Sequence, residues 1–332
     1  MRNVIIAGTG SYIPETVLTN HELVATLAKE GIDSSDDWIV AHTGIRERRI
    51  AARSESTSDL GYKAALKALE AAEMDISDID LILCATSTPD MYLPSTACVI
   101  QGKLGGKQSA AFDVNAACSG FIYALGTAYY YLKAGAYDNA LVIGAETYSR
   151  LVDWKDRRSC VFFGDGAGAV LLKKSDRKDV GIRGVHLGAD GSQGESITAR
   201  ACGAAPTCER GEAVGGNGKF AMNGREVYRF AINAFPEAVE ALFLKLDCSP
   251  SDVDLLISHQ ANINIIRDSL KQLGICESKA YINIQRYGNT AAASIPIALD
   301  EAMRKGLAPS GSNLLLVGFG GGLTWGAMLI SL

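Results

Sequence analysis

The sequence has 332 residues, of which 48% are hydrophobic and 21% charged, so it can bury a large core and lacks the low hydrophobicity of a disordered chain. Its formal net charge is -5, and Lys and Arg form no basic stripe, which argues against nucleic acid as a partner. The first apolar run is short and is broken by Gly and Pro, so we expect neither a signal peptide nor a membrane span, and we expect a cytoplasmic protein.

Short runs of Val, Ile and Leu alternate with helical stretches, a pattern typical of a mostly parallel sheet covered by helices on both faces. The sequence therefore predicts the α/β class. The predicted strands, in chain order, are 4–7, 81–85, 111–114, 140–144, 167–172, 255–258, 281–284 and 314–317. A helix is predicted from about Ser58, because apolar residues recur on one helical face between that point and residue 75.

The second half of the chain repeats the first. Two pairs of segments match at an offset of 174 residues: DIDLILCAT (78–86) with DVDLLISHQ (252–260), and ALVIGAE (140–146) with LLLVGFG (314–320). Coincidental strands would not keep this order and spacing, so we predict two similar halves, 1–174 and 175–332, with a functional site at their pseudo-twofold junction. The segment 197–220, rich in Gly and Ala and without periodicity, is predicted to be a loop or flap.

The eight cysteines are scattered, without a C-x-x-C pair and without a His at zinc-finger spacing. In a chain with a full-sized core and no secretion signal, we expect reduced thiols rather than a disulfide framework, and no metal.

Cys118 is the cysteine with the most informative position. It follows the predicted strand 111–114 and precedes an apolar helical run, so it should lie at a helix N-terminus. Unpaired amides and the helix dipole favour a thiolate there, which predicts a lowered pKa and a nucleophile. Considered only as one cysteine among eight, it would more often be a buried structural residue.

Two polar residues of the second half hold comparable positions. His259 ends the strand 255–258, and Asn289 lies in a turn before an Ala-rich helix. Ligands of α/β folds bind at the carboxyl ends of parallel strands, although each residue alone would more often be structural. The glycines of GFGGGLTWGA (318–327) could point backbone amides at an oxyanion, or could form a tight turn.

Cys, His and Asn without a metal suit acyl transfer through a thioester. Cys118 would carry the acyl group. A neutral His259 imidazole and the Asn289 amide could donate hydrogen bonds to the enolate that forms when a malonyl thioester loses carbon dioxide. That enolate could then attack the acyl-cysteine and form a carbon–carbon bond.

Nearly the whole chain resembles β-ketoacyl-[acyl carrier protein] synthase III, the thiolase-fold enzyme that initiates type II fatty acid synthesis. The motifs that carry the resemblance are GTGSYIPE (8–15), WIVAHTGIRERRI (38–50), FDVNAACSGF (112–121), FGDGAGAVLL (163–172), SHQANINII (258–266), YGNTAAASIPIALDEA (287–302) and GFGGGLTWGA (318–327). The resemblance implies a homodimer and a duplicated thiolase-like fold of two pseudo-equivalent halves, each with a mostly parallel mixed sheet, in αβαβα layers. It also implies decarboxylative condensation of an acyl-CoA primer with malonyl-[acyl carrier protein], with coenzyme A thioester as substrate and no cofactor.

The same resemblance implies roles for individual residues. Cys118, His259 and Asn289 would form the catalytic triad, and the backbone N–H groups of Cys118 and Gly321 would form the oxyanion hole. Elongating synthases of this fold carry a second His where this chain has Asn289, so the resemblance is to the initiating type.

Other residues match substrate-binding positions of the family. Trp38 and Arg157 match the pair that packs around the adenine of coenzyme A, and Asn262 and Phe319 match further substrate positions. Leu93 falls where a residue reaches from one subunit toward the acyl pocket of the other, and many acetyl-specific members carry Phe there.

Carrier-protein contacts are expected at Asn264, Arg267 and Lys271. The family usually carries Arg where this chain has Asn264, and also where it has His42. Loss of two cations that could bind phosphate weakens the expected grip on phosphopantetheine partners.

The same residues leave one alternative function open, and a second is disfavoured by the nucleophile. An acyltransferase or condensing enzyme of specialised metabolism could use a non-acetyl primer or a different acceptor. A non-catalytic thiolase-fold subunit should have lost the nucleophile, whereas Cys118 is present.

Overall fold

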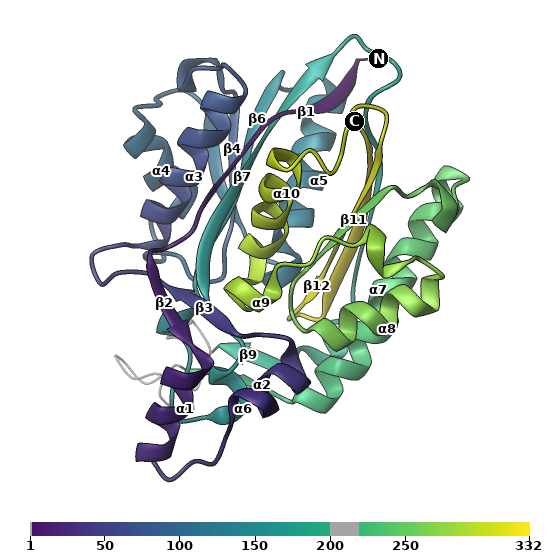
Figure 1. Ribbon diagram of the computed structural model, residues 1–332. Coiled ribbons are helices and arrows are strands. Elements are labelled where there is room, and N and C mark those ends of the chain that lie inside the picture. Colours follow the sequence, from purple (N-terminus) through teal and green to yellow (C-terminus); the bar gives the residue numbers. More distant parts are fainter. Residues whose placement is uncertain (1, 200–218) are drawn as a thin grey trace.

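The computed structural model describes residues 2–199 and 219–332, which form two β-sheets with helices between and outside them (Figure 1). The strands of the two sheets are β1 (Asn3–Tyr12), β4 (Leu81–Ala85), β5 (Ala110–Val114), β6 (Asn139–Thr147), β7 (Asp165–Ser175), β8 (Gly181–Ala189), β11 (Leu255–Ser258), β12 (Asn313–Gly320) and β13 (Thr324–Ser331). The first sheet has the order β1-β7-β6-β4-β5, and the second has the order β11-β12-β13-β8.

Two helices, α5 (Gly120–Ala134) and α10 (Ser294–Arg304), lie between the sheets. Their side chains share one apolar cluster with residues of both sheets, such as Leu83 of β4 and Leu316 of β12. A helix buried between two sheets must be apolar on most of its surface, as the Ala- and Tyr-rich sequence of α5 is.

The outer faces of the sheets are covered by two helices each. The helices α3 (Thr57–Ala71) and α4 (Thr96–Leu104) pack on the first sheet, and α7 (Gly224–Leu246) and α8 (Ile263–Leu273) pack on the second. The α3 helix begins one residue before the predicted Ser58, in a capping box between Ser56 and Asp59. The predicted α/β class with αβαβα layers is confirmed.

Shorter elements lie around one end of the sheets, at the bottom of Figure 1. They are β2 (Thr16–Thr19), α1 (Asn20–Lys29), α2 (Asp36–Thr43), β3 (Glu47–Ile50), α6 (Arg157–Cys160), β9 (Ile197–Ala199), β10 (Phe220–Met222) and α9 (Ile284–Tyr287). The 3₁₀-helices are η1 (Ile76–Asp78), η2 (Ala117–Ser119), η3 (Tyr148–Arg150), η4 (Gly191–Ser196), η5 (Pro250–Asp252), η6 (Glu277–Lys279) and η7 (Ala291–Ala293). Of the predicted flap 197–220, the ends pair as β9 and β10, and 200–218 lie outside the described residues.

The 174-residue offset of the sequence reappears in hydrogen bonds. The side-chain amide of Asn139 donates to the Asp78 carbonyl (3.1 Å), and that of Asn313 donates to the Asp252 carbonyl (2.9 Å). These matched contacts support the internal repeat, while the position of the boundary between the halves stays a prediction.

Three predictions about strands were wrong. Residues 281–284 form no strand, because only Ala280 makes an isolated bridge to Leu256 before α9 begins. Strands β8 and β13 are absent from the predicted set, since glycines interrupt β8 and the triple glycine before β13 favours a turn. The expected mixed character of the sheets is confirmed, but they are less parallel than predicted: β7 and β13 each run antiparallel to both neighbours, and an apolar run does not reveal strand direction.

Across residues 2–199 and 219–332, none of the helices is both long enough and apolar enough to cross a bilayer.

Candidate active site

Cys118 lies in η2, between the end of β5 and the start of α5. Ala117 before it has a positive φ of 46°, which turns the chain sharply at this point. Gly320, at the end of β12, packs directly on Cys118: a Cβ at position 320 would lie 2.7 Å from the Cys118 Cβ and 2.9 Å from its backbone nitrogen. Only glycine therefore fits beside the Cys118 amide.

The glycine turn after β12 is tied to the Cys118 loop by hydroxyl groups. The Thr324 hydroxyl lies 2.9 Å from the Gly321 carbonyl and 3.1 Å from the Ala116 carbonyl. It also lies 2.7 Å from the Ser119 hydroxyl. This network holds the backbones of Cys118 and Gly321, the predicted oxyanion-hole residues, on adjoining loops.

His259 follows β11 and is 1% exposed. Its backbone N–H donates to the Val317 carbonyl (2.8 Å), its Nδ1 lies 2.7 Å from the Ser294 hydroxyl, and the edge of the Phe319 ring packs at 5.2 Å. Burial lowers the pKa of His259 to about 3, because the charged imidazolium loses its hydration. The imidazole is therefore neutral at neutral pH, as predicted.

Asn289 is buried and precedes η7. Its backbone N–H donates to the Phe162 carbonyl (2.8 Å), and its side-chain Oδ1 accepts from the Ala291 N–H (2.9 Å). In the part of the chain that the structure describes, its Nδ2 group has no hydrogen-bond partner. That group is the free donor of the site.

The structure brings the loops of the three predicted catalytic residues together. The η2 helix of Cys118 contacts both η7, which follows Asn289, and β12. Consecutive residues of β12 touch the other two loops, since Phe319 packs on His259 and Gly320 packs on Cys118. A thiol, a neutral imidazole, a free amide and a glycine turn thus lie at one edge of the two sheets.

The pKa of Cys118 contradicts the sequence prediction. Burial raises the pKa of the thiol, and the negative charge of nearby Glu146 raises it further, while a backbone hydrogen bond acts weakly in the opposite direction. The cost of burying a thiolate therefore exceeds the benefit of the helix N-terminus. The resting form is the thiol.

A groove of about 730 Å³ is lined by Trp38 and several cationic side chains. The Arg157 guanidinium lies 4.5 Å from the centre of the Trp38 ring, and the His42 ring stacks on Trp38 at 4.4 Å. The remaining basic residues of the wall, which sequence reasoning missed, are Arg158, Arg225 and Arg229. The i, i+4 spacing of the last two at the start of α7 is the signal that could have found them.

Cys118 packs against an apolar cluster that contains three aromatic side chains. Tyr148 stacks on Phe163 at 4.8 Å, and Phe220 meets Phe163 edge-on at 4.6 Å, in the apolar cluster that also includes Cys118. Tyr148 and Phe220 were not predicted as site residues. The cluster gives Cys118 the apolar surroundings that an acyl chain needs.

Comparisons with known proteins identify the family of this chain. The family models for 3-oxoacyl-[acyl-carrier-protein] synthase III match residues 112–191 and, for the C-terminal part, 244–332. A β-ketoacyl-[acyl-carrier-protein] synthase III of Clostridium acetobutylicum is 46% identical, with 99% of each chain covered. The chain belongs to this family.

Solved structures lead to the same family. The crystal structure of 3-oxoacyl-[acyl-carrier-protein] synthase III from Aquifex aeolicus is 43% identical, with a TM-score of 0.90 and coverage of 99% of this chain and 100% of that one. The priming β-ketosynthase of the R1128 polyketide pathway is 32% identical, with a TM-score of 0.89 and coverage of 99% and 96%. This synthase III chain is therefore a condensing acyltransferase with the thiolase fold.

Two residues predicted to bind substrate or carrier protein, Asn262 and Asn264, line the groove at Trp38 and also cap a helix. The Asn262 amide donates to the His42 carbonyl (2.8 Å), and the Asn264 amide lies 3.3 Å from the carbonyls of both Ala41 and His42. These are the last carbonyls of α2, which have no partner inside the helix. The two side chains thus hold α2, the helix that carries Trp38.

The other expected carrier contacts lie on the same helix, α8. Arg267 is paired with Glu277 (3.1 Å), with both side chains about half exposed. Lys271 has no ion-pair partner among the described residues. Of the two cationic residues among the predicted contacts, Arg267 is paired within the chain, and Lys271 has no ion-pair partner in the described part of the chain.

Leu93 lies in the loop between β4 and α4 and is 86% exposed. Its neighbours Met91 and Tyr92 are 50% and 68% exposed, so three large apolar side chains in sequence face solvent. A contiguous exposed apolar segment of this kind is typical of a contact surface.

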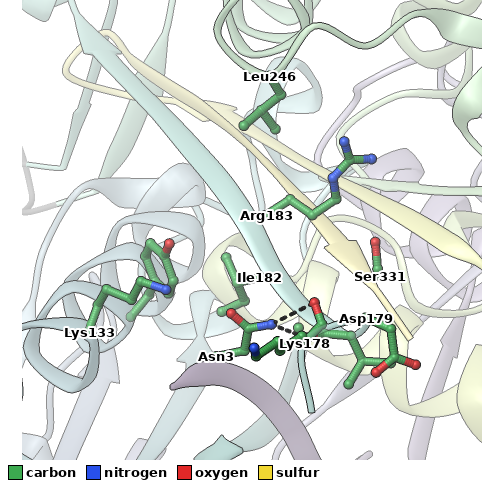
Figure 2. A pocket seen from close by; sticks show the side chains of 11 residues that line it. Asn3, Lys133, Lys178, Asp179, Ile182, Arg183, Leu246 and Ser331 are labelled. Carbon is green, nitrogen blue, oxygen red and sulfur yellow. Dashed lines mark hydrogen bonds between the residues drawn. The ribbon is translucent and has the colours of Figure 1, made fainter. Parts of the chain in front are cut away.

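A second hollow, of about 320 Å³, lies near both chain termini and is lined by residues that include Asn3, Lys133, Arg183 and Ser331 (Figure 2). The Asn3 amide donates to backbone carbonyls of the wall. Lys133 is in the last turn of α5, whereas Cys118 precedes the first, so the helix separates the two places by about 20 Å. None of the predicted site residues lines this hollow.

Proposed function

We propose that this synthase III chain initiates fatty acid synthesis, condensing an acyl-CoA primer carried on Cys118 with malonyl-[acyl carrier protein]. The observation that carries the proposal is the Cys118 thiol beside the Gly320–Gly321 turn, with the neutral His259 imidazole and the free Asn289 amide on adjoining loops. The 46% identity to a synthase III over the full chain supports it.

In the first step, the Cys118 sulfur would attack the thioester carbonyl of acyl-CoA. The carbon–sulfur bond to coenzyme A breaks, and coenzyme A leaves as a thiol with the proton that Cys118 gives up. The oxyanion of the intermediate would be met by the backbone N–H groups of Cys118 and Gly321. The absence of a side chain at Gly320 keeps this place open.

In the second step, a malonyl thioester would lose carbon dioxide, and its enolate oxygen would accept hydrogen bonds from His259 and Asn289. The enolate carbon attacks the acyl-cysteine, the carbon–sulfur bond breaks, and the Cys118 sulfur takes a proton from solvent. A neutral imidazole suits this step because it donates a hydrogen bond without transferring its proton.

The groove at Trp38 would receive coenzyme A and the phosphopantetheine of the carrier protein. Its arginines suit phosphate groups, and the Trp38 ring with the Arg157 guanidinium suits an adenine. The proposal includes a homodimer in the cytoplasm, in which Leu93 contacts the partner subunit. The exposed Met91–Leu93 segment supports the dimer, and sedimentation velocity of the purified chain tests it.

A role in specialised metabolism is the alternative. The polyketide priming enzyme is 32% identical to this chain, against 46% for the synthase III of Clostridium acetobutylicum, so the similarity favours the fatty acid enzyme.

The test is acylation followed by condensation. Incubation with a panel of acyl-CoA primers should add one acyl mass to the intact protein, and Cys118→Ala should remove it. Addition of malonyl-[acyl carrier protein] should then release carbon dioxide and form the β-ketoacyl product. No adduct with any primer, or transfer to oxygen or nitrogen without release of carbon dioxide, would contradict the proposal.

A further inference from the structure

Glu146 is a buried carboxylate to which the proposed reaction gives no role. It is the penultimate residue of β6, is 0% exposed, and has no cationic partner among the described residues. Its oxygens accept hydrogen bonds from the Thr88 hydroxyl (2.5 Å), the Ser87 N–H (3.1 Å) and the Thr86 hydroxyl (3.3 Å). The backbone N–H of Ala292, in the other half of the chain, lies close enough to lower the pKa of this carboxyl, and β6 packs against η7. Burial without a countercharge is costly, so a set of converging donors is needed to hold this side chain.

The internal repeat relates the surroundings of Glu146 to those of Cys118. Asn115 and Asn289 are 174 residues apart, and each accepts, through Oδ1, the N–H of the residue two positions on (3.3 Å and 2.9 Å). Those residues, Ala117 and Ala291, have the same unusual positive φ, 46° and 45°. Position 292 is therefore the counterpart of position 118, and the Ala292 N–H is the counterpart of the Cys118 N–H.

The counterpart of Glu146 at the same offset is Gly320. Gly320 leaves the space before the Cys118 N–H open, whereas the Glu146 carboxyl lies near the matching Ala292 N–H, where β6 packs against η7. The chain thus has two similar anion positions. One is free for a substrate oxyanion, and the other is permanently filled by a side chain.

We propose, on the basis of the condensing function above, that Glu146 is a positioning residue that fills the second oxyanion position and thereby holds the turn carrying Asn289. The carboxylate joins the Thr86–Thr88 segment to η7, and η7 lies between Asn289 and the Ser294 hydroxyl that contacts His259. Loss of the anchor would leave buried donors unpaired and loosen both of these residues.

Glu146 also acts on the nucleophile through its charge. The titratable groups that face it are Cys84 on β4, Cys118 on η2 and Tyr148 on η3, while η7 contains only alanines. On β7, Asp165 lies opposite Thr147 with its oxygens bonded to the N–H of Ala51 and the hydroxyl of Ser149. Because the Glu146 charge raises the pKa of Cys118, its removal should make the thiolate form at lower pH.

The test compares Glu146→Gln with Asp165→Asn, which neutralises another fully buried acid that lies outside the catalytic turns. In Glu146→Gln we expect carbon dioxide release from a malonyl thioester to fall about tenfold or more. We also expect the pH midpoint of Cys118 alkylation by iodoacetamide to fall by about half a unit or more. In Asp165→Asn, release should stay within about twofold and the midpoint should not move.

An unchanged midpoint or unchanged release in a folded Glu146→Gln would overturn the inference, because a merely structural residue would not shift the midpoint. If Glu146→Gln does not fold, Glu146→Asp serves: it keeps the charge but retracts it by one methylene, so release should fall while the midpoint stays. Full release by Glu146→Asp would also overturn the inference. Failure of the wild-type protein to release carbon dioxide would instead reject the proposed function, and the alkylation profile would still report on Glu146.

Discussion

The Ser294 hydroxyl is the hydrogen-bond partner of the His259 imidazole. The Ser294 hydroxyl lies 2.7 Å from His259 Nδ1 and 2.9 Å from the Ala291 carbonyl, and its single proton can serve one of them at a time. If it is donated to Nδ1, the imidazole keeps its proton on Nε2, where it can reach an enolate oxygen. The proposed decarboxylation therefore requires Ser294 as the donor to His259.

Ser294→Ala should lower the rate of malonyl decarboxylation by about tenfold or more while the KM for the malonyl substrate changes little, because the tautomer matters in the transition state rather than in binding. Steady-state release of carbon dioxide measures both constants. Ser269→Ala is the matched control, since it removes a buried hydroxyl without a hydrogen-bond partner among the described residues. Equal activity of the two variants would show that the tautomer is not set by Ser294.

At the scale of elements, the groove depends on the contact between α2 and α8. The start of α8 supplies the Asn262 and Asn264 amides to the last carbonyls of α2, and α2 carries Trp38 and His42 on its outer side. Asn262 is also the N-cap of α8, since its Oδ1 accepts the Asn264 N–H (2.9 Å). One side chain thus stabilises two helix ends.

Asn262→Ala should destabilise the protein by about 1 kcal/mol and raise the KM for acyl-CoA several-fold, because α2 and the Trp38 ring lose their anchor. Thermal unfolding and primer kinetics measure the two effects. Ser56→Ala removes the N-cap of α3, far from the groove, and should lower stability alone. A KM for acyl-CoA that stays at the wild-type value in Asn262→Ala would contradict a role of this contact in binding.

Buried strands and the residues beside them can be predicted from the sequence, whereas strand direction and contacts between distant segments cannot. Buried strands such as β4 and β12 are visible as apolar runs, and Cys118, His259 and Asn289 are visible because they follow or precede such runs. The direction of β7 and β13 is not visible, since the same apolar pattern suits parallel and antiparallel pairing. The capping role of Asn264 depends on a contact across more than 220 residues, which local pattern does not reveal.

The pKa of Cys118 and the role of Glu146 illustrate a similar limit. Helix position alone favours a thiolate, but burial and a charge from another strand decide the pKa. Glu146 stands at the last position of the aligned segments ALVIGAE and LLLVGFG, opposite Gly320. A Glu in one copy of the repeat where the other copy has Gly indicates that the two positions differ in function.

At the scale of the whole molecule, two buried groups with opposite effects shape the pH dependence of stability. Burial raises the pKa of Glu146 from 4.5 to about 7, so between these values the folded protein holds a proton that the unfolded chain has released, and stability falls as pH rises. Burial lowers the pKa of His259 from 6.5 to about 3, so between these values the unfolded chain binds the additional proton, and stability rises with pH. Between pH 4.5 and 6.5 the two effects oppose each other.

Replacement of either group should therefore leave the pH dependence of stability that the other group contributes. Relative to the wild-type protein, Glu146→Gln should gain about 1 kcal/mol of unfolding free energy from pH 5 to pH 6, and His259→Gln should lose about as much. Urea unfolding at the two pH values measures this, and the comparison with wild type cancels the groups that all three proteins share. Changes of the same sign in both variants would show that the Glu146 carboxyl and the His259 imidazole do not titrate in opposite directions.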